Sequence, residues 1–103
     1  MSELSHSGIQ DLLRARKTEI LAIAARHGAY NIRVFGSVAR DEDTATSDID
    51  LLVDYDPTKR SPWFPVGFVQ ELEALLNQKV DVATPAMLKE RIRDRVLQEA
   101  TPL

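Results

Sequence analysis

The chain has 103 residues, of which 44% are hydrophobic and 28% are charged, and its formal net charge is −3. This length and composition fit one folded domain over residues 1–103 with a modest core, and they exclude a disordered chain. The absence of cysteine excludes disulfides and thiolate metal sites. The acidic balance disfavours sequence-independent nucleic-acid binding, which relies on a basic surface. There is neither a secretory signal pattern nor an apolar run near the ~20 residues of a membrane span, so we expect a cytoplasmic protein.

The first half of the chain alternates between helical and extended patterns. Between residues 8 and 27 apolar residues recur at helical spacing, which predicts one helix with Ser7 as its N-cap and Gly28 just after its end. Further along, the pattern predicts a strand over 32–35, a short helix over 37–42, a polar loop over 43–47 and a strand over 48–55.

The second half continues the alternation. After a turn at Asp56-Pro57, the pattern predicts a helix over 66–77, a strand over 79–83 and a last helix from Thr84-Pro85 to about residue 100. Trp63 and Phe64 lie between prolines, where they either pack on the core or form an exposed anchor for a partner. Strands that alternate with helices predict an α/β (α+β) domain, with a small mixed sheet flanked by helices.

Two carboxylates stand at the start of the strand predicted over 48–55. Side chains alternate along a strand, so Asp48 and Asp50 point to the same face. Two adjacent carboxylates repel each other unless a cation lies between them, and Mg²⁺ typically takes one or two carboxylates plus substrate phosphates. Asp81 stands on the polar face of the next strand. If these two strands are neighbours, three carboxylates converge and can hold two metal ions.

A glycine-serine pair lies between the first two predicted strands. Gly36 allows close backbone approach to a ligand. Ser37 is expected to cap the short helix that follows, whose free N–H groups favour an anion. Arg40 lies one helical turn further on and could reach the same phosphates with its guanidinium group. The pattern therefore predicts a site for a triphosphate and its metal ion.

These residues together carry a family resemblance. Gly36-Ser37, then ten residues and Asp48-Ile49-Asp50, with Asp81 on a later strand, resemble the nucleotidyltransferase (polymerase β palm-like) fold of the DNA polymerase β superfamily. The segments 36–40 and 47–51 are similar to those of the minimal nucleotidyltransferases, which are single-domain proteins of about this length. The resemblance extends from about residue 32 to the C-terminal helix.

The resemblance implies an activity and a partner. Such proteins act as antitoxins of HEPN-domain toxins, probable RNases, and transfer AMP from ATP to a toxin tyrosine with the help of Mg²⁺. The resemblance also implies a set of roles: nucleotide binding by Gly36, Ser37, Arg40 and Ser47, and catalysis and metal binding by Asp48, Asp50 and Asp81.

The residues alone also allow interpretations in which these side chains have no functional role. The paired aspartates could belong to a solvated edge strand, Asp81 to an ordinary exposed position, and Arg40 to a surface ion pair with Glu42 or Asp43. Two other functions stay open as well. The protein could neutralise a toxin by complex formation alone, or it could modify a small molecule or an RNA end.

Overall fold

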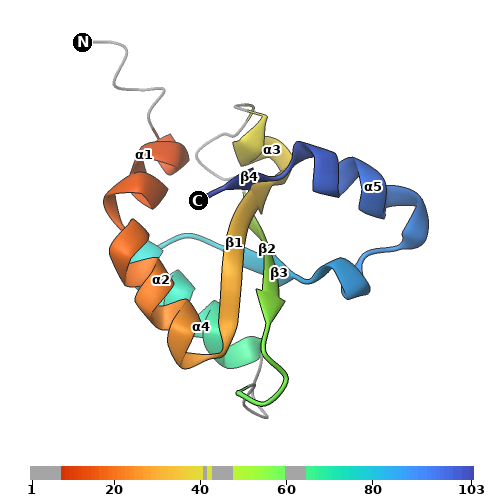
Figure 1. Cartoon of the computed structure of the whole chain (residues 1–103). Helices are drawn as coiled ribbons and strands as arrows, with labels where there is room; N and C mark the ends of the chain where they lie inside the picture. The colour runs from red at the N-terminus through yellow and green to blue at the C-terminus, as the bar shows by residue number, and fades with distance from the viewer. Residues whose placement is uncertain (1–7, 41, 43–47, 60–64) are drawn as a thin grey trace.

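The structure is a computed structural model, which describes residues 8–40, 42, 48–59 and 65–103 (Figure 1). The elements in chain order are α1 (Gly8–Ala15), α2 (Lys17–Arg26), β1 (Ala29–Phe35), α3 (Gly36–Ala39), β2 (Ile49–Tyr55), α4 (Val66–Leu76), β3 (Val80–Ala83), the 3₁₀ helix η2 (Pro85–Met87), α5 (Glu90–Glu99) and β4 (Thr101–Pro102). The predicted loop 43–47, with Ser47, and the aromatic pair Trp63 and Phe64 lie outside the described residues.

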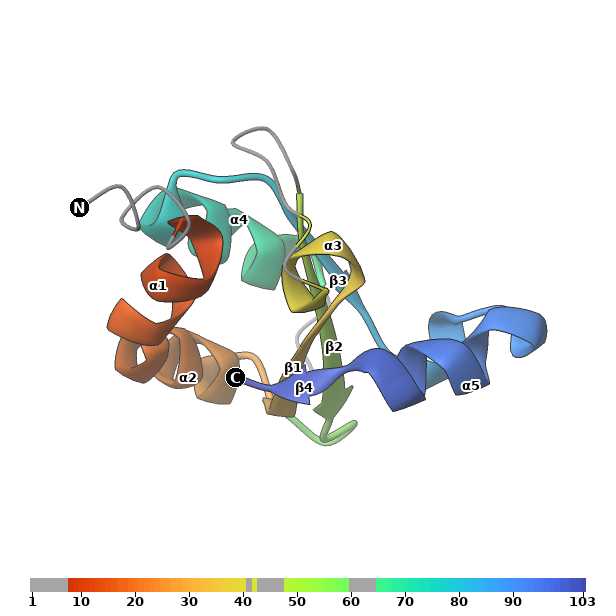
Figure 2. The same cartoon turned by 90° about the horizontal axis from the view of Figure 1, so that it is seen from above.

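The sheet is mixed, as predicted, and its strand order is β3-β2-β1-β4. β1 runs antiparallel to both β2 and β4, whereas β2 and β3 are parallel. Figure 2 shows α1, α2 and α4 on one face of the sheet, while α5 projects from the other side. The two faces of the sheet therefore have different surroundings, with α1, α2 and α4 on one side and α5 on the other.

Alternation along β2 creates the core on the helical face. Ile49, Leu51 and Val53 are fully buried and belong to one apolar cluster with Phe68 and Leu72 of α4. Because alternate residues of a strand face opposite ways, Asp50 must point to the other face, where α5 lies. The burial that fixes the register of β2 thus also fixes the side on which its carboxylate is presented.

The helix predicted over residues 8–27 is wrong as a single element, because the structure breaks it at Arg16. Arg16 has φ −107° and ψ 14°, outside the helical range. The break lets α2 pack against β1 while α1 turns toward α3, where the Gln10 side-chain amide donates to the Val38 carbonyl at 2.6 Å. Tertiary contacts override a continuous local helical pattern here.

The last predicted helix is also divided. Thr84-Pro85 begins the short η2 helix, without a side-chain cap from the threonine, and α5 begins only at Glu90. The intervening Leu88 is extended, with φ −81° and ψ 141°. The Arg93 side chain donates to the carbonyls of Pro85 and Leu88 at 2.9 and 3.0 Å, which supplies hydrogen bonds that a continuous helix would have made.

The edge strand β4 was not predicted. The sequence pattern predicts only that the last helix ends near residue 100, yet residues 101–102 pair with Val34 and Arg33 of β1. Proline is compatible with an edge strand because its missing N–H can face away from the sheet. Across the described ranges, no helix combines the length and apolar character needed to cross a membrane.

Candidate functional site

Gly36 is pressed directly against a carboxylate of the site. Its φ of +77° lies in the left-handed region, which favours glycine. A Cβ at this position would overlap Oδ2 of Asp50 and lie 3.1 Å from its Cγ. Phe35, just before the glycine, is paired with Asp50 across the β1–β2 ladder. The turn therefore needs a residue without a side chain, and Asp50 occupies the space that this leaves.

The three predicted carboxylates lie on neighbouring backbones. β3 is the direct neighbour of β2, and Asp81 is the register partner of Asp50 in this parallel pair. Paired residues of adjacent strands point to the same face, with backbones ~4.8 Å apart. Asp48 is one step before β2 and is exposed like Asp81, whereas Asp50 is half-buried. The sequence-based condition for convergence, adjacency of the two strands, is thus met.

Asp50 has an unusual protonation equilibrium. Burial raises its pKa to about 6, and the negative charges of Asp81 and Asp48 contribute to the same shift. Arg40 acts in the opposite direction. Ionisation of Asp50 is unfavourable because the group is half-buried and lies beside two other carboxylates. A nearby cation would stabilise its charged form. The electrostatics of this edge therefore favour binding of a cation.

The chemistry of the three side chains fits a hard divalent cation, which prefers oxygen ligands. Among the described residues, no group of three His, Cys, Asp or Glu side chains is already arranged around a common metal position. Asp48 and Asp81 are exposed, so their side chains can change rotamer when a cation arrives. Three carboxylates without a counter-charge repel each other, which opposes a closed arrangement.

Ser37 does not cap α3. The helix begins one residue earlier, at Gly36, and its N-cap position is the extended residue Phe35. Ser37 therefore lies in the first turn, where its backbone carbonyl accepts a hydrogen bond from the N–H of Glu42 at 2.8 Å. The helix ends at Ala39, earlier than predicted, and its fully buried Val38 anchors it to the core. Ser37 itself is half-buried.

Arg40 forms two ion pairs in the structure. Its Nε lies 2.9 Å from Oε1 of Glu42, one of the surface partners considered from the sequence. Its Nη1 lies 2.6 Å from Oε2 of Glu99, the last residue of α5. Sequence reasoning missed Glu99, because the two residues are 59 positions apart and no motif links them. The guanidinium group is close enough to the site to lower the pKa of Asp50.

The acidic residues that follow Asp50, Asp54 in β2 and Asp56 just after it, have structural partners. Asp54 accepts hydrogen bonds from Asn31 at 2.9 Å and from Arg33 at 3.2 Å, across the irregular register of β1. Asp56 accepts from the backbone N–H and the hydroxyl of Thr58, at 2.9 and 2.7 Å. Asp56 is thus a turn residue, as its sequence context indicates.

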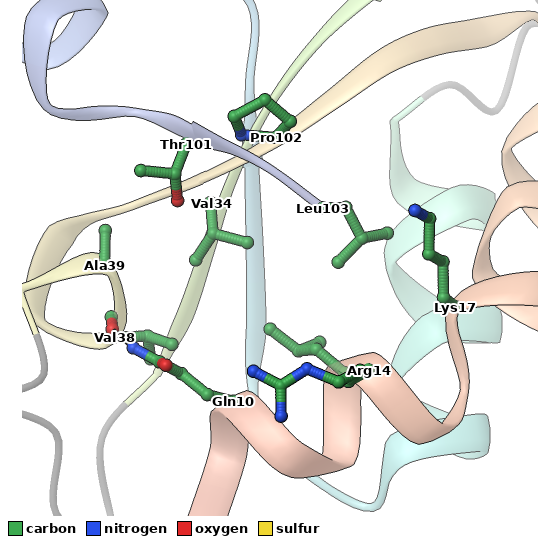
Figure 3. A pocket seen from close by; sticks show the side chains of 10 residues that line it. Gln10, Arg14, Lys17, Val34, Val38, Ala39, Thr101, Pro102 and Leu103 are labelled. Atoms are coloured by element: carbon green, nitrogen blue, oxygen red, sulfur yellow. Dashed lines mark hydrogen bonds between the residues drawn. The ribbon is translucent and has the colours of Figure 1, made fainter.

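A cavity of about 500 Å³ lies behind α3 (Figure 3). Val34 and Val38 form part of its wall, the C-terminal residue Leu103 lies across it, and Arg14 and Lys17 stand at one side. None of the three carboxylates lines this cavity. The candidate site is separate from it, near the N-terminal ends of β2 and β3.

Comparison with known proteins gives consistent matches. A family model described as a nucleotidyltransferase domain matches residues 17–103. The protein adenylyltransferase MntA of Thermococcus cleftensis is 36% identical over 99 residues, which cover 96% of this chain and 96% of that protein. A provisionally named protein adenylyltransferase of Methanocaldococcus jannaschii is 40% identical over 84 residues, covering 82% of this chain and 89% of the relative.

Two solved structures are similar in fold. One, described provisionally as a minimal nucleotidyltransferase, has a TM-score of 0.79 and 44% sequence identity, and covers 90% of this chain and 94% of that chain. The other is a crystal structure of a toxin-antitoxin with AMP-PNP, with a TM-score of 0.63 and 21% identity over 84% of this chain and 70% of that chain. At that identity, the second likeness concerns the fold alone.

Proposed function

The chain belongs to the nucleotidyltransferase domain family, and on this premise we propose that it transfers AMP from ATP to a tyrosine hydroxyl of a HEPN-domain toxin, which it thereby neutralises. The observation that carries the proposal is the packing of Gly36 against Asp50, with Asp81 in register on the neighbouring strand. It brings a glycine turn and two carboxylates into one place, as a metal-assisted nucleotidyl transfer requires.

In this proposal the carboxylates hold Mg²⁺ and the turn holds the triphosphate. Asp48, Asp50 and Asp81 are the metal ligands, and the bound Mg²⁺ supplies neutralisation of phosphate charge. Gly36, Ser37, Arg40 and Ser47 are assigned to the nucleotide. The glycine allows the backbone of the turn to approach a phosphate, and Arg40 offers a guanidinium group suited to phosphate oxygens.

In the proposed reaction, the site holds ATP and the acceptor tyrosine in position for attack. The tyrosine oxygen attacks the α-phosphorus of ATP, a new P–O bond forms, and the bond to the β-phosphate oxygen breaks with release of pyrophosphate. Asp81, exposed at the edge of the cluster, orients the incoming hydroxyl or accepts its proton. Most of the rate enhancement is expected from alignment and charge neutralisation.

Two observations support a protein acceptor. The relatives MntA and the M. jannaschii protein carry the name protein adenylyltransferase, and one structural neighbour is a toxin-antitoxin with AMP-PNP. The carboxylates lie near the N-terminal ends of the neighbouring strands β2 and β3, where Asp48 and Asp81 are exposed. A side chain carried by a second protein can therefore approach them. We place this reaction in the cytoplasm, where ATP is available.

The test uses the product of the neighbouring gene as acceptor, because the family resemblance implies that such proteins are encoded beside their HEPN-domain partner. We expect α-labelled ATP, but not γ-labelled ATP, to label it, with a mass gain in whole AMP units. The double variant Asp48→Asn/Asp50→Asn should lose more than about 100-fold in transfer rate, because the metal ligands are gone. Asp11→Asn is the matched control, since Asp11 makes only an exposed ion pair with Arg14.

Other outcomes point elsewhere. Transfer by the double variant at the wild-type rate refutes the assignment of the carboxylates. A γ-label indicates a kinase-like reaction. A stable complex without label, which still protects cells when both aspartates are replaced, indicates neutralisation by complex formation alone. Label on RNA or on a small molecule, and not on protein, indicates a different acceptor class.

A further inference from the structure

The ion pair between Arg40 and Glu99 joins the candidate nucleotide site to a distant part of the chain. Arg40 follows α3 directly, whereas Glu99 ends α5. The Glu99 side chain is only 17% exposed, against 64% for Glu42, the other partner of Arg40. A partly buried, short ion pair is screened less by water than an exposed one. Of the two carboxylates that pair with this guanidinium group, Glu99 is therefore the one less screened by water.

Glu99 ends a segment made of η2 and α5, which we call the η2–α5 arm (residues 85–99). Arg93 ties its two helices together through the carbonyls of Pro85 and Leu88. The helix or strand that α5 contacts most is α3, the helix that ends beside Arg40. Figure 2 shows the rest of α5 extending away from the sheet. The arm thus meets the region of the site at two places, where α5 contacts α3 near Glu99 and where η2 contacts β2.

We propose that Glu99 competes with the phosphates of the nucleotide for Arg40, so that triphosphate binding weakens the contact between the η2–α5 arm and α3. The inference rests on the proposed function, because it requires a triphosphate beside Arg40. Two of the nitrogens of Arg40 already face carboxylates, Nε toward Glu42 and Nη1 toward Glu99. A bidentate phosphate uses Nη2 together with either Nε or Nη1, so it competes with at least one of these carboxylates.

Displacement has a consequence for the arm. Once Arg40 turns to the phosphates, Glu99 is a mostly buried carboxylate that has lost its cation and faces added negative charge. Such a group is unfavourable, so the end of α5 is expected to move or to become more exposed to water. Coupling of this kind is reciprocal. Any protein that holds the arm away from α3 should therefore strengthen nucleotide binding.

The experiment is a double-mutant cycle on nucleotide affinity. The probe is the ATP analogue with a methylene bridge between the α- and β-phosphates, with Mg²⁺, titrated into the full chain by calorimetry. We expect Glu99→Gln to bind the analogue roughly three- to tenfold more tightly, since it removes the competitor. Arg40→Gln should bind it more weakly. In the Arg40→Gln background, Glu99→Gln should change the affinity less than about twofold.

The cycle separates competition from two simpler effects. If Glu99 only repels the triphosphate, the gain persists in the Arg40→Gln background, which overturns the proposal. If Glu99 only holds Arg40 in a useful position, Glu99→Gln weakens binding, which also overturns it. Glu90→Gln, at the exposed start of α5, is the matched control for loss of one negative charge, and the structure gives Glu90 no ion pair among the described residues.

A second readout follows the arm directly. The N–H of Ala100 donates to the carbonyl of Val96 at 2.8 Å and reports on the end of α5. We expect its hydrogen exchange to accelerate when the analogue binds to the wild-type chain, and to stay unchanged in Arg40→Gln at saturating analogue. Unchanged exchange in the wild type overturns the proposal. If the wild-type chain does not bind the analogue at all, the proposed function itself fails; if it binds with an Arg40 dependence but without the Glu99 effect, only this inference fails.

Discussion

Replacement of Gly36 by alanine is expected to damage the site and the fold at once. At φ +77° an alanine costs ~1–2 kcal/mol through its Cβ. The same Cβ would overlap Oδ2 of Asp50, so the carboxylate must also move. For a domain of this size, the backbone cost alone corresponds to a fall in Tm of roughly 5–15 °C. Displacement of a reacting or ligating group by ~1 Å can lower the rate about 100-fold.

Gly28→Ala provides the matched control. Gly28 has nearly the same φ, +75°, and an added Cβ there would lie 2.9 Å from Cβ of Lys59, far from the carboxylates. Both variants should lose stability by similar amounts in thermal unfolding followed by circular dichroism. Only Gly36→Ala should lose AMP transfer and Mg²⁺-dependent nucleotide binding, assayed well below both melting temperatures. If Gly36→Ala retains the wild-type rate, or if Gly28→Ala loses it equally, the assignment of Gly36 to the site is refuted.

Three further predictions concern the same region. Asp50 has its pKa raised from 3.8 to about 6 by burial and by Asp81 and Asp48, so its contribution to stability is fully present below pH ~4 and is lost as the pH rises through about 6. The shift corresponds to at most ~3 kcal/mol, and screening of this half-buried group by water reduces that to ~1–2 kcal/mol. Urea unfolding without Mg²⁺ at pH 4.5 and 7.5 should show this loss, and Asp50→Asn should abolish it; an unchanged pH dependence in the variant would contradict the assigned cause. Asp81→Asn is expected to lower the transfer rate by more than about tenfold with a smaller effect on nucleotide affinity, measured by initial rates and by titration, and equal losses in both would remove its assigned role toward the acceptor. Arg93→Ala should accelerate amide hydrogen exchange at residues 86–88, since it removes two hydrogen bonds from a charged donor, whereas unchanged exchange would show that the η2–α5 arm is held by other contacts.

The strands β2 and β3 are predictable from the sequence because each must bury apolar side chains on one face and present a carboxylate on the other. In β2, alternation puts Ile49 and Leu51 in the core and Asp50 on the opposite face, and burial confirms it at these positions, although Leu52 on the face of Asp50 is buried as well. β3 repeats the pattern with Asp81 between two buried valines. Adjacency of the two strands was only a condition at the sequence level, since one chain does not reveal its strand order.

The failures have a common physical origin in long-range contacts. The break at Arg16 follows from the need of α1 and α2 to pack on different elements, and the local pattern carries no sign of it. β4 exists because residues 101–102 find a free edge of β1. The ion pair of Arg40 with Glu99 likewise depends on where α5 returns to the sheet. Ser37 was misplaced by one residue, which is within the usual uncertainty of helix ends.

The parallel pairing of β2 and β3 decides how the site tolerates changes in chain length. Asp50 and Asp81 are neighbours through the register of the ladder, and the connection through α4 does not itself hold them together. Residues inserted between β2 and α4 should therefore leave the carboxylates in place, since a longer connection costs only fractions of a kcal/mol per doubling of its length, about 0.6. One residue inserted inside β3 ahead of Asp81 would instead turn that carboxylate into the core and expose a valine. The number of residues between Asp50 and Asp81 can therefore change without loss of the site. The alternate position that each of them occupies in its strand cannot change, because it decides the face to which the carboxylate points.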